Sequence, residues 1–114
     1  MAEIILFIKD FELGARLSSA CVDLNHQIKF TDENSDPLTF SPEIKLAIVD
    51  MDEEVFSSVG LISELKRRNL SVIGTMKKLN NRERSKLQTA GCDIIITRSA
   101  LVKSISRLIS ELID

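Results

Sequence analysis

The chain lacks tryptophan and tyrosine, and it has two cysteines, two prolines and one histidine among 114 residues. Without Trp and Tyr, an aromatic platform that stacks bases or sugars is not expected. Cys21 and Cys92 are far apart and lack metal-ligand spacing, which favours reduced thiols in the cytoplasm. A single histidine supports no Ser/His/Asp triad.

Charge, hydropathy and missing motifs argue against further classes of function. The net charge of -2 gives no basic footprint, so we predict no nucleic-acid partner. No apolar stretch approaches about 20 residues, and no signal peptide is evident, so we predict no membrane span and a cytoplasmic location. No phosphate-cradling loop, dinucleotide fingerprint or zinc spacing is found, and we expect no enzyme. The length suits one domain over residues 1–114.

Two short, largely apolar runs, at residues 4–10 and 45–50, each end in an aspartate, Asp10 and Asp50. Runs that are short, β-branched and apolar on both faces are typical of buried strands in a parallel sheet. Ligands bind such sheets at the carboxyl ends of the strands, where the strand order reverses. The two aspartates therefore indicate a site for a cation or a phosphoryl group.

The remaining pattern alternates between the two element types. Apolar residues at helical spacing, with suitable capping residues, predict four helices. These are at residues 11–24, 52–68, 81–90 and 100–113. Short apolar runs predict strands at residues 3–8, 28–31, 45–50, 71–75 and 93–97. Two prolines make residues 32–42 a loop or a poorly formed helix. The alternation predicts an α/β fold with a parallel sheet, and right-handed crossovers place helices on both faces.

Over nearly its whole length, the chain resembles the receiver domain of two-component response regulators. The resemblance rests on Asp10, Asp50 and Thr75 after the first, third and fourth strands, and on the Ala90-Gly91-Cys92-Asp93 turn. It implies a flavodoxin-like sheet of order 2-1-3-4-5. It also implies that Asp50 is the phospho-acceptor position and that Thr75 hydrogen-bonds the phosphoryl group. Asp10, Asp50 and the backbone carbonyl of Asp52 would hold Mg²⁺.

The chain also departs from that family at several site positions. Lys9 replaces the first of two consecutive acids, and Arg98-Ser99 replaces the lysine and proline after the fifth strand. Ile95 stands at the aromatic switch position, and the second helix is expected to be shortened or lost. Together these changes resemble a degenerate receiver, or pseudo-receiver.

The positive charge of Lys9 is expected to weaken the binding of Mg²⁺ at this site. Mg²⁺ prefers about six oxygen ligands, with carboxylates among them. A unit charge about 4 Å away interacts at roughly 4 kcal/mol at an effective dielectric near 20. Lys9 is expected either to pair with Asp50 in the cleft or to lie in solvent. Because phosphoryl transfer depends on positioning and charge neutralisation, we expect slow transfer or none.

Three functions stay open. The first is an interaction module that needs no aspartyl phosphate or cofactor and binds signalling proteins, such as a histidine kinase or an effector, or a second copy. The expected surface is helix four, strand five and helix five of the family, here residues 81–113. The last helix has a wide apolar stripe, so a charge at Ile109 or Val102 should disrupt association but not folding.

The second function is a working phospho-acceptor, in which Asp50 reacts, Asp10 and Glu12 hold Mg²⁺, and Arg98 replaces the lysine. The third is a small enzyme or ligand-binding domain on the same scaffold. Simpler roles compete with these: Asp10 and Asp52 are plausible helix caps. One further group of side chains is either a solvated face or a docking patch for an acidic partner. It consists of Lys77, Lys78, Arg82, Arg84 and Lys86.

Overall fold

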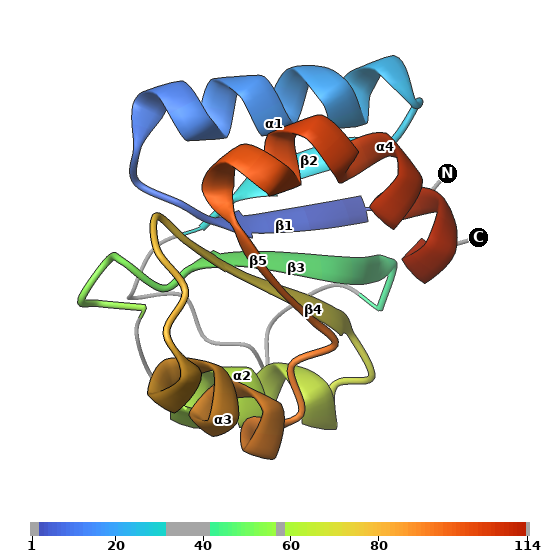
Figure 1. Ribbon diagram of the computed structural model, residues 1–114. Helices are drawn as coiled ribbons and strands as arrows, with labels where there is room; N and C mark the ends of the chain where they lie inside the picture. Colours follow the sequence, from blue (N-terminus) through green and yellow to red (C-terminus); the bar gives the residue numbers. More distant parts are fainter. Residues whose placement is uncertain (1–2, 32–41, 57–58, 114) are drawn as a thin grey trace.

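The computed structural model describes residues 3–31, 42–56 and 59–113. Five parallel strands form one sheet in the order β2-β1-β3-β4-β5 (Figure 1). The strands are β1 (Glu3–Phe7), β2 (Gln27–Phe30), β3 (Ile44–Asp50), β4 (Ser71–Met76) and β5 (Ile94–Thr97). The predicted sheet and its strand order are confirmed.

Helices cover both faces of this sheet, as predicted. The helices are α1 (Phe11–Asp23), α2 (Val59–Arg67), α3 (Asn81–Ala90) and α4 (Arg98–Ile113). Figure 1 shows α1 and α4 on one face and α2 and α3 on the other. No helix in the described part of the chain is long and apolar enough to cross a bilayer.

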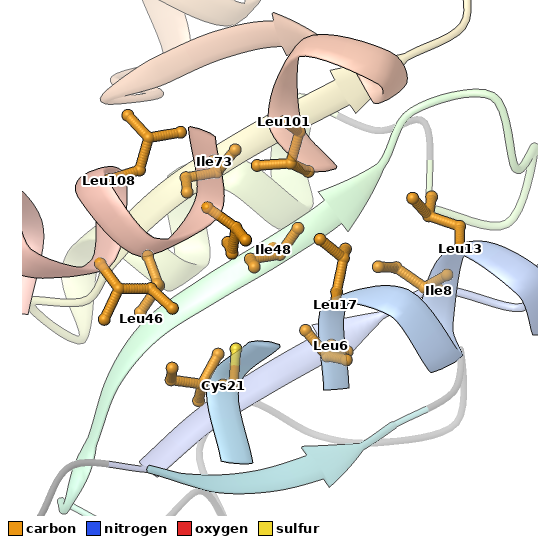
Figure 2. Close-up of a cluster of buried hydrophobic side chains, with 13 residues drawn as sticks. Leu6, Ile8, Leu13, Leu17, Cys21, Leu46, Ile48, Ile73, Leu101 and Leu108 are labelled. Atoms are coloured by element: carbon orange, nitrogen blue, oxygen red, sulfur yellow. The ribbon is translucent and has the colours of Figure 1, made fainter. Parts of the chain in front are cut away.

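The central strands supply the core because both of their faces are buried. Leu6, Leu46 and Ile48 are fully buried on the face of the sheet that α1 and α4 cover (Figure 2). On the other face, the rings of Phe7 and Phe56 meet edge to face, with centroids 5.5 Å apart. Full burial of one large apolar side chain stabilises a fold by roughly 1.5–3 kcal/mol. This core fixes the strand ends on which the polar site is built.

Local signals set several of the element ends. The Asp10 carboxylate caps α1 by accepting from the Leu13 N–H at 2.9 Å. Asn80 caps α3 in the same way, and α3 ends at Gly91, whose φ of 100° suits glycine. Asn69, with φ 62°, follows α2. These predicted starts and stops are confirmed to within a residue or two.

The predicted start of α2 is wrong. Residues 51–56 form turns, in which the Glu53 N–H donates to the Asp50 carbonyl and the Phe56 N–H donates to the Glu53 carbonyl. The carboxylate of Asp52 accepts from the distant Lys77 N–H and so caps no helix of its own. Val55, which lies within the predicted helix, is 47% exposed. The predicted erosion of the helix between β2 and β3 falls on residues 32–41, outside the described residues.

The expectation for Ile109 is also wrong. Ile109 is 1% exposed and belongs to the core, together with Leu101, Ile105 and Leu108 of α4. Val102 is half-buried and packs against the same core. The wide apolar stripe of α4 is therefore largely used inside the domain, and a charge at Ile109 would disrupt folding.

Candidate functional site

The predicted site residues lie at one edge of the sheet because parallel strands end together. Asp50 is the last residue of β3, and Thr75 is its register partner on β4. Arg98 follows β5 directly, and Asp10 lies between β1 and α1. Asp52 is in the turn after β3. The structure thus brings together all five of the site residues that the resemblance implied.

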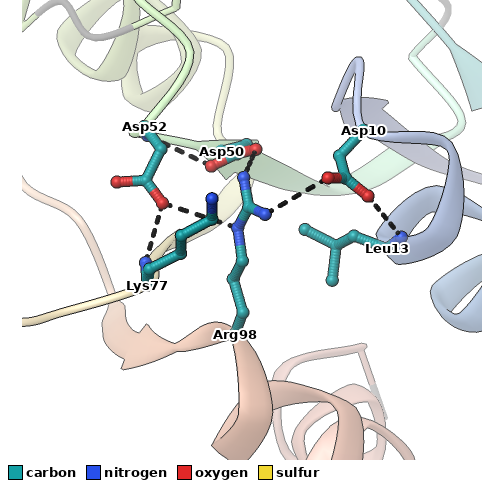
Figure 3. A network of polar contacts seen from close by, with 6 residues as sticks. All are labelled: Asp10, Leu13, Asp50, Asp52, Lys77 and Arg98. Carbon is teal, nitrogen blue, oxygen red and sulfur yellow. Dashed lines mark hydrogen bonds and ion pairs between the residues drawn. The ribbon is translucent and has the colours of Figure 1, made fainter.

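Arg98 lies at the centre of three carboxylates (Figure 3). Its Nη2 is 2.5 Å from Oδ2 of Asp50, and its Nη1 is 3.4 Å from Oδ2 of Asp10. Its Nε is 3.5 Å from Oδ2 of Asp52, an ion pair without hydrogen-bond geometry. The planar guanidinium presents five N–H donors from three nitrogens in a fixed fork, whereas a lysine has three donors on a single nitrogen.

Both carboxylate oxygens of Asp50 are engaged. Oδ2 accepts from Arg98, and Oδ1 accepts from the backbone N–H of Asp52 at 3.1 Å. The side chain is fully buried, and this burial raises the pKa of Asp50. The Asp52 N–H and the Arg98 guanidinium oppose that rise. Asp50 is consequently a buried group whose charge depends on one cationic partner.

The carboxylates of Asp10 and Asp52 also accept hydrogen bonds from backbone N–H groups. Oδ1 of Asp10 accepts from the Leu13 N–H, and this bond lowers the pKa of Asp10, with Arg98 adding to the effect. Oδ2 of Asp52 accepts from the Lys77 N–H at 2.7 Å and so ties the turn after β3 to the end of β4. The cap role considered for Asp10 is confirmed, whereas Asp52 does not cap α2.

Thr75 is buried beside Asp50, and its hydroxyl has no hydrogen-bond partner in the described part of the chain. Lys9 is exposed. Arg98, rather than Lys9, is the cation between the carboxylates. Glu12, considered as an alternative metal ligand, forms an exposed ion pair with Arg16 at 2.9 Å.

The carboxylates as placed do not fit Mg²⁺. Mg²⁺ needs near-octahedral oxygens at roughly 2.0–2.1 Å, whereas Asp10, Asp50 and Asp52 surround a guanidinium. Across residues 3–31, 42–56 and 59–113, no three His, Cys, Asp or Glu side chains are grouped in a way that could hold a metal ion. The guanidinium takes the charge-balancing position that a divalent cation would need.

A pocket of about 440 Å³ reaches this site from the side of α1 and α4. Its lining includes Asp10, Arg98, Val102 and Lys103. Solvent therefore reaches the outer side of the guanidinium and the Asp10 carboxylate. Asp50 is fully buried and is not part of this lining. A reactant that entered the pocket would meet Arg98 before it met Asp50.

No protein-family model and no curated protein sequence matches the chain. Its fold is similar to solved response regulators. The chemotaxis protein CheY4 of Vibrio cholerae matches with a TM-score of 0.83 and 8% identity, over 99% of both chains. The phosphorylated cyanobacterial phytochrome response regulator RcpA matches with a TM-score of 0.80 and 12% identity, over 99% of this chain and 94% of that chain.

A response regulator from Thermotoga maritima matches with a TM-score of 0.75 and 14% identity, over 96% of this chain and 98% of that chain. At sequence identities this low, the similarity shows a shared fold and nothing about function. The chain therefore has the receiver-domain fold, and what its site does has to be argued from its own residues.

Proposed function

We propose that the chain is a degenerate receiver that acts in signal transduction through protein contacts, without aspartyl phosphorylation. One observation carries the proposal: Nη2 of Arg98 lies 2.5 Å from Oδ2 of Asp50, which is fully buried. The acceptor position is thus closed by a side chain of the same protein.

The chemistry of phosphoryl transfer supports this proposal. An attacking carboxylate needs an accessible oxygen, and the transferred group needs cations that neutralise its charge. Both oxygens of Asp50 already accept hydrogen bonds. The guanidinium that could neutralise charge is already shared among Asp10, Asp50 and Asp52. Phosphorylation would first have to break this network in a buried place.

A working phospho-acceptor that uses Asp50 with Mg²⁺ is the second candidate, and Thr75 favours it. A fully buried hydroxyl without a partner costs free energy, and this one belongs to the register partner of Asp50. A phosphoryl oxygen on Asp50 would offer that hydroxyl an acceptor. In this alternative, Arg98 must leave Oδ2 of Asp50, and Asp10 and Asp52 must turn to the metal.

Incubation with Mg²⁺ and acetyl phosphate, or with beryllofluoride, separates the two candidates. We expect no phosphoryl adduct in the intact mass of the wild type and no change in its amide NMR spectrum. Asp50→Asn is the matched control because it removes the acceptor and keeps the shape of the side chain. An adduct or spectral change in the wild type that is absent from Asp50→Asn would establish the second candidate.

We further propose that the interaction surface is α3, β5 and α4, the family surface expected at residues 81–113. Its partners would be signalling proteins such as a histidine kinase or an effector, or a second copy, in the cytoplasm. The half-buried edge strand β5 and the exposed side of α3 support this choice. Light scattering over a concentration series tests the homodimer: a constant single-chain mass contradicts it and leaves a different protein as the partner.

A further inference from the structure

The exposed side chains on and just before α3 are strongly basic. Lys78, Arg82, Arg84 and Lys86 are all exposed, and we call these four side chains the α3 basic patch. Arg82 and Lys86 share one flank of the helix, Arg84 lies on the other flank, and Lys78 precedes the helix. Leu87 is the one buried residue of this helix. Together with Glu83, the patch carries a net charge of +3. The rest of the chain holds 11 basic and 16 acidic side chains, a net charge of -5. The patch is therefore a local basic surface on an acidic protein.

The position of the arginines conflicts with the stability of the helix. Arg82 and Arg84 lie in or beside the first turn of α3. This is the positive end of the helix dipole, where acidic side chains are favoured. The Asn80 cap and Glu83 offset the conflict only in part. Where a local rule is broken without a structural gain, a functional role is the expected reason.

The patch also lacks internal neutralisation. Among the described residues, Lys78, Arg82 and Arg84 have no ion-pair partner, and Lys86 has only a 3.9 Å contact with Glu83. The four side chains cannot neutralise one another because all of them are positive. A bound anion would supply the missing negative charge. Because α3 is part of the interaction surface proposed above and contacts β5, a partner bound to the patch would lie on that surface.

We propose that the α3 basic patch binds an acidic segment of a partner protein, an inference that rests on the proposed interaction function. A helix of 10 residues is about 15 Å long, and the field of a charge extends about 8 Å at physiological salt. A short acidic segment bound at α3 would therefore feel mainly the positive field of the patch. A nucleic-acid duplex is longer and would also meet the acidic remainder, and the chain offers no Trp or Tyr for base stacking.

A fluorescent poly-glutamate peptide is the probe, and its anisotropy measures binding to the full chain at several salt concentrations. We expect Arg82→Glu combined with Arg84→Glu to raise Kd about tenfold or more. The same double variant should keep or raise the Tm because it places acids at the positive end of α3. Undiminished stability would show that the weaker binding does not come from unfolding of α3.

Arg67→Glu combined with Arg68→Glu is the matched control. It changes the net charge by the same amount at the exposed end of α2, away from the patch. We expect this control to keep Kd within about twofold of the wild type at low temperature. Equal weakening in both double variants would mean that total charge alone attracts the peptide, and it would overturn the proposal.

Three further outcomes would also overturn it. In the first, the wild type does not bind the peptide. In the second, duplex DNA of the same charge binds as tightly as the peptide or more tightly. In the third, the chain self-associates, and the patch variant abolishes this self-association but still binds the peptide. The phosphoryl-donor experiment reports on Asp50 and is independent of the patch. Absence of both an adduct and peptide binding would reject the acidic partner and leave the phosphate-independent module in place.

Discussion

Asp50 and Thr75 are register partners on β3 and β4, and both side chains are fully buried, but only the carboxylate has hydrogen-bond partners. The carboxylate has an N–H donor and a guanidinium, while the hydroxyl beside it has neither a donor nor an acceptor among the described residues. A buried unsatisfied polar group costs about 1–3 kcal/mol. Of the two neighbours, only Thr75 is therefore left with an unmet hydrogen-bonding requirement, which gives a simple test of the site.

Thr75→Val should stabilise the fold by about 1 kcal/mol because valine has nearly the same shape and removes the unsatisfied hydroxyl. Thr97→Val is the control. The Thr97 hydroxyl accepts from the Ala100 N–H at the start of α4, so its loss should cost about 1 kcal/mol. Urea unfolding of both variants measures these changes. A loss of stability in Thr75→Val would mean that its hydroxyl is satisfied.

Arg98→Met should lower the free energy of unfolding by about 3 kcal/mol at pH 7. The substitution keeps an apolar stem but leaves the buried Asp50 carboxylate without its cationic partner. Arg98 is itself only 17% exposed, so solvent compensates little for the loss. Chemical denaturation of the two proteins at pH 7 measures the difference.

The cost of Arg98→Met should also depend on pH. Burial raises the pKa of Asp50 above its unfolded value of 3.8, so the native state holds this proton more tightly than the unfolded state. The ionised group therefore destabilises the fold increasingly as pH rises above 3.8, up to the native pKa. Without Arg98 that pKa rises further, and the gap between the wild type and the variant should widen with pH.

Asp50→Asn separates the charge from the packing in this experiment. The amide cannot ionise, so adding Arg98→Met to Asp50→Asn should cost much less than adding it to the wild type. The gap between the single and double variants should then be nearly constant between pH 4 and pH 7. A gap that widens equally with Asn at position 50 would assign the pH dependence to another group.

Much of the fold follows from signals that lie close together in the sequence. Asp10 and Gly91 act on backbone groups within three or four residues, so their roles could be predicted. The apolar runs of β1 and β3 predict burial on both faces because few polar residues interrupt them. The strand order, in contrast, came from the resemblance to receivers.

The parts that the sequence did not reveal depend on distant partners. Arg98 pairs with residues 48 and 88 positions away, so local spacing carries no sign of the network. Asp52 looks like a helix cap, but its carboxylate is used by Lys77, 25 residues further along. The apolar stripe of α4 shows which residues avoid water, but it does not show whether they pack inside the domain or against a partner. The prediction for Ile109 was wrong for this reason.

Removal of the Arg98 side chain should create a magnesium site. In Arg98→Ala, the carboxylates of Asp10, Asp50 and Asp52 lose their common cation, and their mutual repulsion favours a divalent ion. Mg²⁺ should then raise the stability of the variant by about 1.4 kcal/mol at ten times its Kd. The wild type should show no such rise. Thermal unfolding with and without MgCl₂, at matched ionic strength, measures both.

The combined variant Arg98→Ala and Asp50→Asn controls for the identity of the ligand. Loss of one of the three carboxylates should remove most of the Mg²⁺ effect, because the remaining pair supplies too few anionic oxygens. If Mg²⁺ stabilises the wild type as much as Arg98→Ala, the guanidinium does not compete with the metal. In that case Asp50 would be open to the phosphoryl chemistry that its ion pair with Arg98 is proposed to exclude.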